Sequence, residues 1–123
     1  MATNTEINKR RYSDLHEHIE ALRAVGLLVE IDREINKDTE MHPLVRWQFR
    51  GGIPEPERKA FLFTNITCAR GRKYDIPVVI GALAANREIY RIGMGVALDE
   101  IGATWSRAIA NPIPPLIVTE APC

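Results

Sequence analysis

The sequence predicts a single α/β (α+β) domain in which three to four helices pack on a mixed sheet of about four strands. Apolar residues recur at helical spacing in several stretches, and short runs of β-branched and aromatic residues alternate with these stretches. Glycine or proline stands at most of the boundaries. A chain of 123 residues that is 46% hydrophobic is long enough to bury a core as one domain.

The first predicted helix begins near Ser13, a residue type that favours the N-cap position. Its apolar side chains recur at i, i+4 and i+7, so they should share one buried stripe. Gly26 is expected to end this helix as a C-terminal glycine does. The run 27–31 follows and has the composition of a strand. The expected stripe consists of Leu15, Ile19 and Leu22.

A second helix is predicted from near Met41 to the glycine pair at 51–52. Pro43 is compatible with a helix only in its first turn, which places the start close to Met41. The polar turn before it offers helix caps. This turn consists of Asn36, Asp38 and Thr39, and the helix would carry Leu44, Val45, Gln48 and Phe49.

Two further strands are predicted at 60–63 and 77–81, and the second is nearly all apolar, as expected of a strand covered on both faces. A helical pattern starts at Asn86 and is interrupted by the glycines at 93 and 95. Another helix is predicted from about 99 to 110. The side chains that these two helices should bury are Ile89, Ile92, Ile101, Trp105 and Ile109.

The proline-rich segment 111–115 ends the last helix, and 116–118 is predicted to be a fourth strand. Natural domains usually end in a helix or a polar tail, so an apolar strand here suggests that the polypeptide was meant to continue. Left alone, such an edge presents unpaired backbone groups and apolar side chains. We therefore expect the chain to self-associate.

Composition argues against several classes of partner. Sixteen basic residues balance sixteen acidic residues, so no net field draws the chain to nucleic acid or to an anionic membrane. The first residues are polar, and no run approaches the ~20 apolar residues of a membrane span. We expect a cytoplasmic protein with a flexible polar leader at 1–11 and a single domain at 12–123.

No set of residues specifies an active site on chemical grounds. Cys68 precedes the cations Arg70 and Arg72, which favour a reactive thiolate, but its loop position favours a thiol without function, and we prefer the second interpretation. The glycines at 93 and 95 lack the third glycine of a dinucleotide fingerprint. The histidines and cysteines are not spaced as zinc ligands. We assign no catalytic, cofactor-binding or metal-binding residue.

Five segments, taken in order, resemble the amino-terminal domain of UbiD-family decarboxylases. The opening helix, glycine and strand are similar to the family's leucine-rich helix and "GELVRI"-like strand. Segments similar to the family's "GGPALLFENV" and "GYDIPVV" follow, and then a proline-rich junction. The resemblance extends from Tyr12 to Cys123. The residues that carry it are 14–22, 25–31, 51–52 with 60–66, 74–79, and 113–115 with 120–123.

The resemblance implies an enzyme that uses prenylated flavin mononucleotide (prenylated FMN), with a divalent metal, usually Mn²⁺, and K⁺ at its phosphate. Such enzymes reversibly and non-oxidatively decarboxylate aromatic or α,β-unsaturated acids, and the cofactor serves as the electron sink. An arginine and two glutamates line the site in a split-barrel domain that would follow this one. This chain alone would then be inactive and would bind none of these cofactors. The chain would be either the amino-terminal domain or a separate subunit of a homo-oligomeric enzyme, and its partner would be the remainder of that enzyme.

The sequence also departs from the family pattern. Residues 81–85 replace the "GNLFG" that family members commonly have. Residues 86–91 reproduce the asparagine, tyrosine and arginine of the split-barrel strand Asn-x-Gly-x-Tyr-Arg, but Glu88 replaces its glycine and the local period is helical. We interpret this match as coincidence. The alternative hypothesis is a free-standing, non-catalytic α/β module that binds a partner protein or a small ligand.

Overall fold

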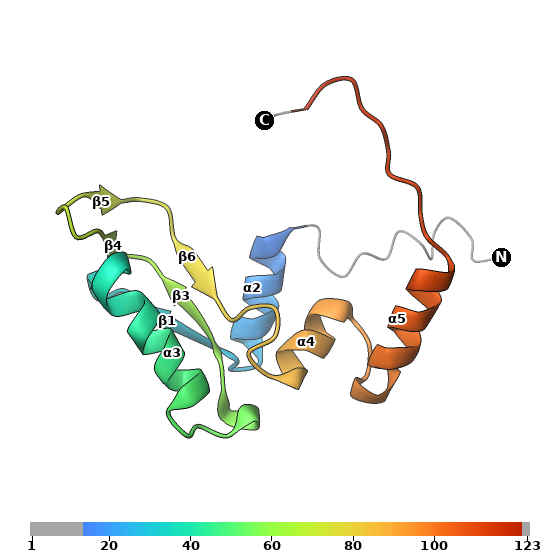
Figure 1. Ribbon diagram of the computed structural model, residues 1–123, viewed down its shortest axis with the longest axis horizontal. Coiled ribbons are helices and arrows are strands. Elements are labelled where there is room, and N and C mark those ends of the chain that lie inside the picture. The colour runs from blue at the N-terminus through green and yellow to red at the C-terminus, as the bar shows by residue number, and fades with distance from the viewer. Residues whose placement is uncertain (1–13, 122–123) are drawn as a thin grey trace.

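The computed structural model describes residues 14–121, so the expected leader and the expected cap Ser13 lie outside the described residues. Within this range the fold is mixed α+β, as the sequence predicts. Helices α2 and α4 lie on one side of the central strands and α3 lies on the other (Figure 1). The helical elements are α2 (Leu15–Ala24), the π-helical turn η1 (Lys37–Met41), α3 (His42–Arg50), η2 (Glu55–Glu57), α4 (Arg87–Met94), η3 (Leu98–Glu100) and α5 (Ile101–Ala110). The strands are β1 (Leu28–Ile31), β2 (Ile35–Asn36), β3 (Ala60–Phe63), β4 (Ile66–Thr67), β5 (Lys73–Tyr74) and β6 (Val78–Ile80).

Strand β3 is the centre of the main sheet, whose strand order is β1-β3-β6. β1 runs parallel to β3, with Leu28 opposite Ala60. β6 runs antiparallel to β3, with Val78 opposite Phe63. These three strands confirm the strands predicted at 27–31, 60–63 and 77–81. Both outer strands therefore depend on β3 for their backbone partners.

Alternate residues of the main sheet face two separate cores, because successive side chains of a strand point to opposite faces. On one face, Ala60 and Val79 pack with apolar residues of α2 and α4. On the other face, Phe63 and Ile80 pack with residues of α3. Phe61 and Phe63 stack with ring centroids 6.0 Å apart. The sheet is thus covered by helices on both sides, in three layers.

A second small sheet has the order β2-β4-β5, with a parallel and an antiparallel pair. The sequence did not predict it, and the described residues hold two mixed sheets instead of one mixed sheet of about four strands. Each of its strands has only two residues. A two-residue strand is too short to show the alternation by which a strand is recognised.

Helix α2 buries Ile19 and Leu22 as predicted, but Leu15 is 51% exposed, so the prediction that it is buried is wrong. Leu15 is the first residue of α2, and its side chain lines two surface grooves. The side chain of Asp14 caps the helix by accepting a hydrogen bond from Glu17 N at 3.1 Å. The buried His18 ties α2 to the segment before α4, because its Nε2 lies 2.6 Å from Ala82 O.

Two buried amides hold the backbone that enters β3. Gln48 of α3 donates to Lys59 O at 2.8 Å and accepts from Lys59 N at 2.7 Å, as a neighbouring strand would. Asn86 donates to Arg58 O at 2.8 Å, and its Oδ1 caps α4 by accepting from Ile89 N at 2.7 Å. Both side chains are almost fully buried. The helices on the two faces of the sheet are therefore hydrogen-bonded to Arg58 and Lys59, the two consecutive residues just before β3.

Helix α3 begins at His42, one residue after the predicted start, and Pro43 lies in its first turn as predicted. The predicted polar turn is a cap, because Asn36 Oδ1 accepts hydrogen bonds from the N–H groups of Asp38 and Thr39. Gly81, directly after β6, has φ +80°, and a Cβ there would lie 3.2 Å from the Ala85 side chain. Glycine is needed at this turn, which returns the chain from β6 to α4.

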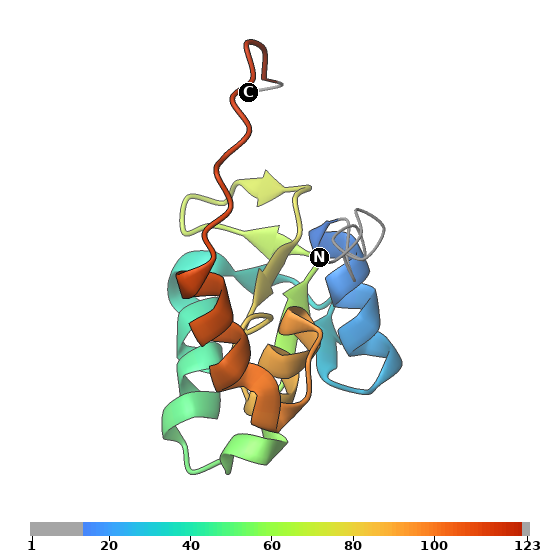
Figure 2. The same cartoon turned by 90° about the vertical axis from the view of Figure 1, so that its right-hand side faces the viewer.

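Two predictions for the carboxyl-terminal part of the chain are wrong. Helix α5 forms as predicted and ends before Asn111, but Trp105 and Ile109 are exposed instead of buried. Residues 116–118 form no strand, and Ile117 is 90% exposed. Strand preference is realised only where a partner strand exists, and in the described structure no strand pairs with this segment. Figure 2 shows the segment leaving the body of the domain after α5.

Replacing Leu22 with Ala is expected to lower the free energy of unfolding by about 2–5 kcal/mol, because Leu22 is fully buried between α2, β3 and α4. Leu15→Ala on the same helix is the matched control and should cost less than half as much, since Leu15 is half exposed. Urea unfolding followed by far-ultraviolet circular dichroism measures both. Equal losses would show that the buried face of α2 is misplaced.

Replacing Gln48 with Ala is expected to cost about 1–3 kcal/mol, because it leaves the buried N–H and C=O of Lys59 without partners. Asn111→Ala removes an exposed amide that bonds Arg107 O, so it should cost clearly less. The same urea measurement applies. A loss for Gln48→Ala no larger than for Asn111→Ala would contradict the role given to this amide.

Candidate functional site

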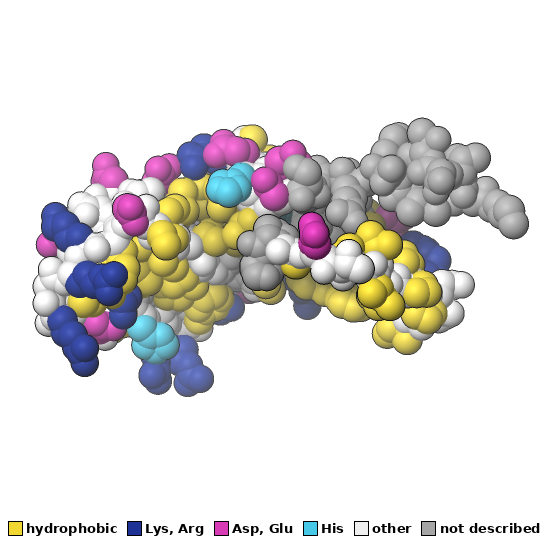
Figure 3. All heavy atoms as spheres, turned by 90° about the horizontal axis from the view of Figure 1, so that it is seen from above, with side chains coloured by type: hydrophobic (Ala, Val, Ile, Leu, Met, Phe, Trp, Pro, Cys, Tyr) yellow, Lys and Arg dark blue, Asp and Glu magenta, His cyan; other side chains and the backbone are white. Residues whose placement is uncertain are grey.

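Helix α2 separates two apolar grooves, and Leu15 lines both. Seen from above, hydrophobic side chains gather in the middle of the face, with acidic and basic side chains along its margin (Figure 3). We call the two depressions the α2–β6 groove and the α2–α5 groove. A partly exposed apolar face of this kind is typical of a surface that meets another protein.

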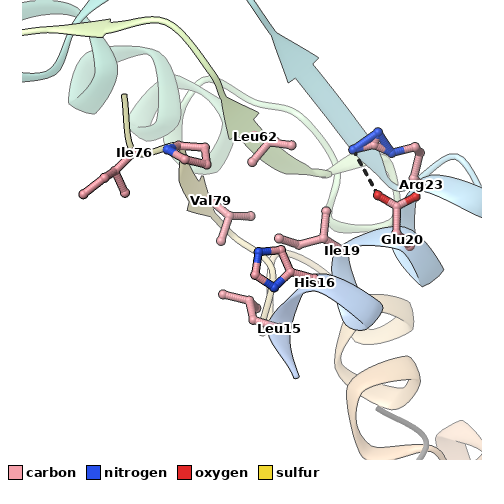
Figure 4. A pocket seen from close by; sticks show the side chains of 9 residues that line it. Leu15, His16, Ile19, Glu20, Arg23, Leu62, Ile76 and Val79 are labelled. Carbon is pink, nitrogen blue, oxygen red and sulfur yellow. Dashed lines mark ion pairs between the residues drawn. The ribbon is translucent and has the colours of Figure 1, made fainter. Parts of the chain in front are cut away.

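The α2–β6 groove has a volume of about 330 Å³ and is floored by the main sheet. Figure 4 shows Leu62 and Val79 of the sheet facing Ile19 and Leu15 of α2, with Ile76 at the far end. Ile76 is 71% exposed. The remaining lining residues are His16, Glu20, Arg23 and Pro77. Helix α4 packs on this face of the main sheet near Ala60, but it does not cover the part of the face that floors the α2–β6 groove.

The charges at the rim of this groove are already paired. Arg23 lies 3.4 Å from a carboxylate oxygen of Glu20 and 3.0 Å from one of Glu30. Each of these side chains is partly exposed, so each pair contributes little to stability. The two carboxylates neutralise the guanidinium of Arg23, the only guanidinium among the residues that line this groove. A carboxylate ligand would find no unpaired cation among the lining residues.

The α2–α5 groove has a volume of about 480 Å³ and lies between α2, α4 and α5. Trp105 of α5 and Tyr90 of α4 form two aromatic walls of this groove. Trp105 Nε1 donates a hydrogen bond to the Tyr90 hydroxyl at 2.7 Å. This bond attaches α5 to the rest of the domain. The other lining residues are Leu15, His18, Leu83, Gly93 and Met94.

A third, polar pocket surrounds Cys68 and has a volume of about 340 Å³. Cys68 is buried, and the pKa of its thiol is lowered, chiefly by the backbone N–H of Arg70. The backbone of Arg72 and the Tyr74 hydroxyl also lower this pKa. From the sequence, such a lowering by nearby cations was the alternative to the preferred interpretation, a thiol without function. The structure assigns it to backbone dipoles at the turn instead.

The same pocket contains an ion pair that is held in place by the backbone. Lys37 Nζ lies 2.7 Å from Asp38 Oδ1, and this hydrogen bond lowers the pKa of Asp38 and raises that of Lys37. Ala69 N donates to Asp38 Oδ2 at 2.9 Å and lowers the pKa of Asp38 further. The carboxylate thus joins η1 to the turn after β4. It is a structural link between the small sheet and α3.

The segment 86–91 does not have the geometry of a cofactor-binding strand. Its residues cap and form helix α4, and the Asn86 amide is already used by Arg58 O and Ile89 N. Tyr90 accepts from Trp105, and Arg91 pairs with Glu88. The interpretation of this match as coincidence agrees with the helix. These residues therefore do not fit a flavin phosphate or its metal.

Two general features of the described residues bear on other kinds of site. Among residues 14–121, no group of three or more His, Cys, Asp or Glu side chains is placed to hold a metal ion. No helix in that same range is both long and apolar enough to cross a bilayer. Besides the grooves next to α2 and the pocket at Cys68, the described surface has a shallow depression on α3 that is lined by Pro43, Arg46, Trp47, Arg50 and Gly51.

The described residues form a mixed α+β fold in which helices pack on both faces of the main sheet. The family model of the 3-octaprenyl-4-hydroxybenzoate carboxy-lyase N-terminal domain matches residues 19–109, and the chain belongs to this family, the amino-terminal domain of UbiD proteins. The resemblance stated from the sequence is confirmed. Comparisons with curated proteins and with solved structures gave no match.

The pKa of the Cys68 thiol is expected to lie below that of an ordinary cysteine, because backbone N–H groups stabilise the thiolate. Thiolate ultraviolet absorbance against pH, in a Cys123→Ser background, measures this. In Arg70→Ala the pKa of Cys68 should stay almost as low, since the backbone N–H of residue 70, which donates to the thiolate, is retained. Tyr74→Phe should raise the pKa part of the way. Full recovery of an ordinary pKa in Arg70→Ala would instead assign the effect to the guanidinium.

Proposed function

We propose that this chain is the non-catalytic amino-terminal domain of a UbiD-like enzyme. The enzyme would catalyse the reversible, non-oxidative decarboxylation of an aromatic or α,β-unsaturated carboxylic acid with prenylated FMN. The catalytic split-barrel domain would lie outside these 123 residues. Membership of the UbiD amino-terminal family supports this assignment. The cytoplasm and a homo-oligomeric enzyme are proposed as its setting.

The α2–β6 groove is the observation on which the proposal rests. Its floor is apolar, and its guanidinium is paired with Glu20 and Glu30. A carboxylic acid substrate would need a cation or several hydrogen-bond donors in such a place. An apolar surface of a neighbouring domain would need neither, and it would remove the half-exposed Leu15 and the exposed Ile76 from water. The groove therefore suits the catalytic domain better than the substrate.

The chemistry of the reaction would belong to the catalytic domain. Prenylated FMN, held with Mn²⁺ and K⁺, would supply the electron sink for loss of carbon dioxide. The side chains that resemble a cofactor strand, Asn86 and Tyr90, are already engaged within this domain. We therefore derive no catalytic step from this chain. Its contribution would be to pack against the catalytic domain and to exclude water from the contact.

The proposal predicts that the purified chain alone binds no flavin and releases no carbon dioxide, but binds the split-barrel domain of its own enzyme. Isothermal titration calorimetry with that separately purified domain measures binding. Ile76→Asp places a carboxylate in the α2–β6 groove and should weaken binding roughly tenfold or more, because the charge would be buried without a partner.

Leu83→Asp is the matched control, since Leu83 is as exposed as Ile76 but lines the other groove. It should weaken binding to the split-barrel domain much less than Ile76→Asp does. Stoichiometric flavin absorbance co-eluting with the chain alone would contradict the non-catalytic role. If Ile76→Asp bound the split-barrel domain as tightly as the unmodified chain, the α2–β6 groove could not be the binding surface. No binding at all would favour the free-standing module.

A further inference from the structure

We propose that residues 113–118, which we call the arm, bind in the α2–α5 groove of a second copy of this chain. The exchange would be reciprocal, so that two copies form a twofold dimer through two identical contacts. The inference deepens the homo-oligomer of the proposed function by naming the surfaces through which two copies would meet, and it concerns a different groove from the one proposed for the split-barrel domain. It rests on the chemistry of the arm, the lining of the groove and their relative positions.

The arm is apolar and extended, and nothing in the described structure covers it. Ile113, Leu116 and Ile117 are each more than four-fifths exposed. The segment has no helix or strand of its own, and Figures 1 and 2 show it directed away from the domain. Three prolines, at 112, 114 and 115, restrict its φ angles and favour the polyproline II conformation. Such a segment loses little conformational entropy when it binds.

The α2–α5 groove has the features by which proteins recognise polyproline II segments, namely an aromatic lining and a hydrogen-bond donor. Trp105 and Tyr90 form the aromatic walls, and Leu83, which is 76% exposed, adds apolar surface. The Tyr90 hydroxyl accepts from Trp105, which leaves its own proton for a carbonyl of the bound segment. The backbone of a polyproline II segment has no internal hydrogen bonds, so its carbonyls are available.

The electrostatics of the two surfaces also match. The lining of the groove contains no Lys, Arg, Asp or Glu, and neither does the chain from 111 to 119. Contact between them would bury no unpaired charge. By contrast, the α2–β6 groove has Glu20 and Arg23 at its rim. The uncharged arm therefore suits the α2–α5 groove better than the charged-rim groove on the other side of α2.

The positions of arm and groove favour a second copy over the arm's own groove. Helix α5 carries Trp105 in the groove wall. The arm leaves from the carboxyl end of the same helix and extends away from the body of the domain (Figures 1 and 2). At roughly 3.1 Å per residue, six arm residues extend roughly 19 Å, far enough to lie along a neighbouring domain. Two reciprocal contacts also bury twice the area of one, which a stable interface needs.

Sedimentation velocity over a concentration series tests the proposal with the full chain. The unmodified chain is expected to form dimers. Ile117→Asp in the arm and Leu83→Asp in the groove should each weaken dimerisation roughly tenfold or more, because each would bury an unpaired carboxylate. Ile76→Asp, in the α2–β6 groove, is the matched control and should dimerise normally. Circular dichroism verifies that each variant is folded.

Mixing the two defective variants distinguishes exchange from a general loss of solubility. A copy with Ile117→Asp keeps an intact groove, and a copy with Leu83→Asp keeps an intact arm. One arm–groove contact can then form between them, so the mixture should contain more dimer than either variant alone. Two variants that were merely damaged would gain nothing from mixing.

Three outcomes would overturn the proposal. The first is a chain that stays monomeric at all concentrations. The second is a dimer that neither Ile117→Asp nor Leu83→Asp weakens. The third is a monomer in which Ile117→Asp shifts the fluorescence of Trp105, measured in a Trp47→Phe background, because this would place the arm in the groove of its own chain. Recovery of dimer on mixing the two variants supports reciprocal exchange.

Discussion

The fold depends on two amide side chains that hold the backbone entering the central strand. Gln48 from one layer and Asn86 from the other bond consecutive residues, Lys59 and Arg58, just before β3 begins. Both neighbours of β3 take their register from it, so the position of this strand entry determines where β1 and β6 lie. Buried backbone groups without partners are unfavourable, which makes these two side chains difficult to replace. The same two side chains fix α3 and α4 relative to β3. Because α2 packs with α4 in one core, the grooves beside α2 depend on this arrangement as well.

The elements that the sequence predicted correctly are those whose signal is local. Runs rich in β-branched and aromatic residues identified β1, β3 and β6, and Asn36 and Pro43 marked where helical structure begins. The failures came where an element needs a partner. Helix α5 has an apolar period, but periodicity indicates which side chains share a face and not whether anything covers that face. The two-residue strands exist only because tertiary structure brings them together.

The grooves could not be predicted for a related reason. Each combines side chains from segments far apart in sequence, such as Ile19 with Val79, or His18 with Trp105. The sequence did give the family, because that depends on the order of segments rather than on their contacts. A lowered pKa for Cys68 was only the alternative to the preferred thiol without function, and it was attributed to cations instead of to the backbone. Nearly every residue has a backbone N–H group, so residue types do not indicate where a turn directs these groups at a thiolate.

Leu15 lies in the wall of both grooves, so the two surfaces are not independent. An occupant that selects one rotamer of this half-exposed side chain changes the shape that the other groove offers. Binding on one side of α2 would then alter the affinity on the other side, and the effect would be reciprocal by thermodynamic linkage. Its sign depends on whether both occupants favour the same rotamer. A single leucine at the start of a helix could thus connect assembly between chains with attachment between domains.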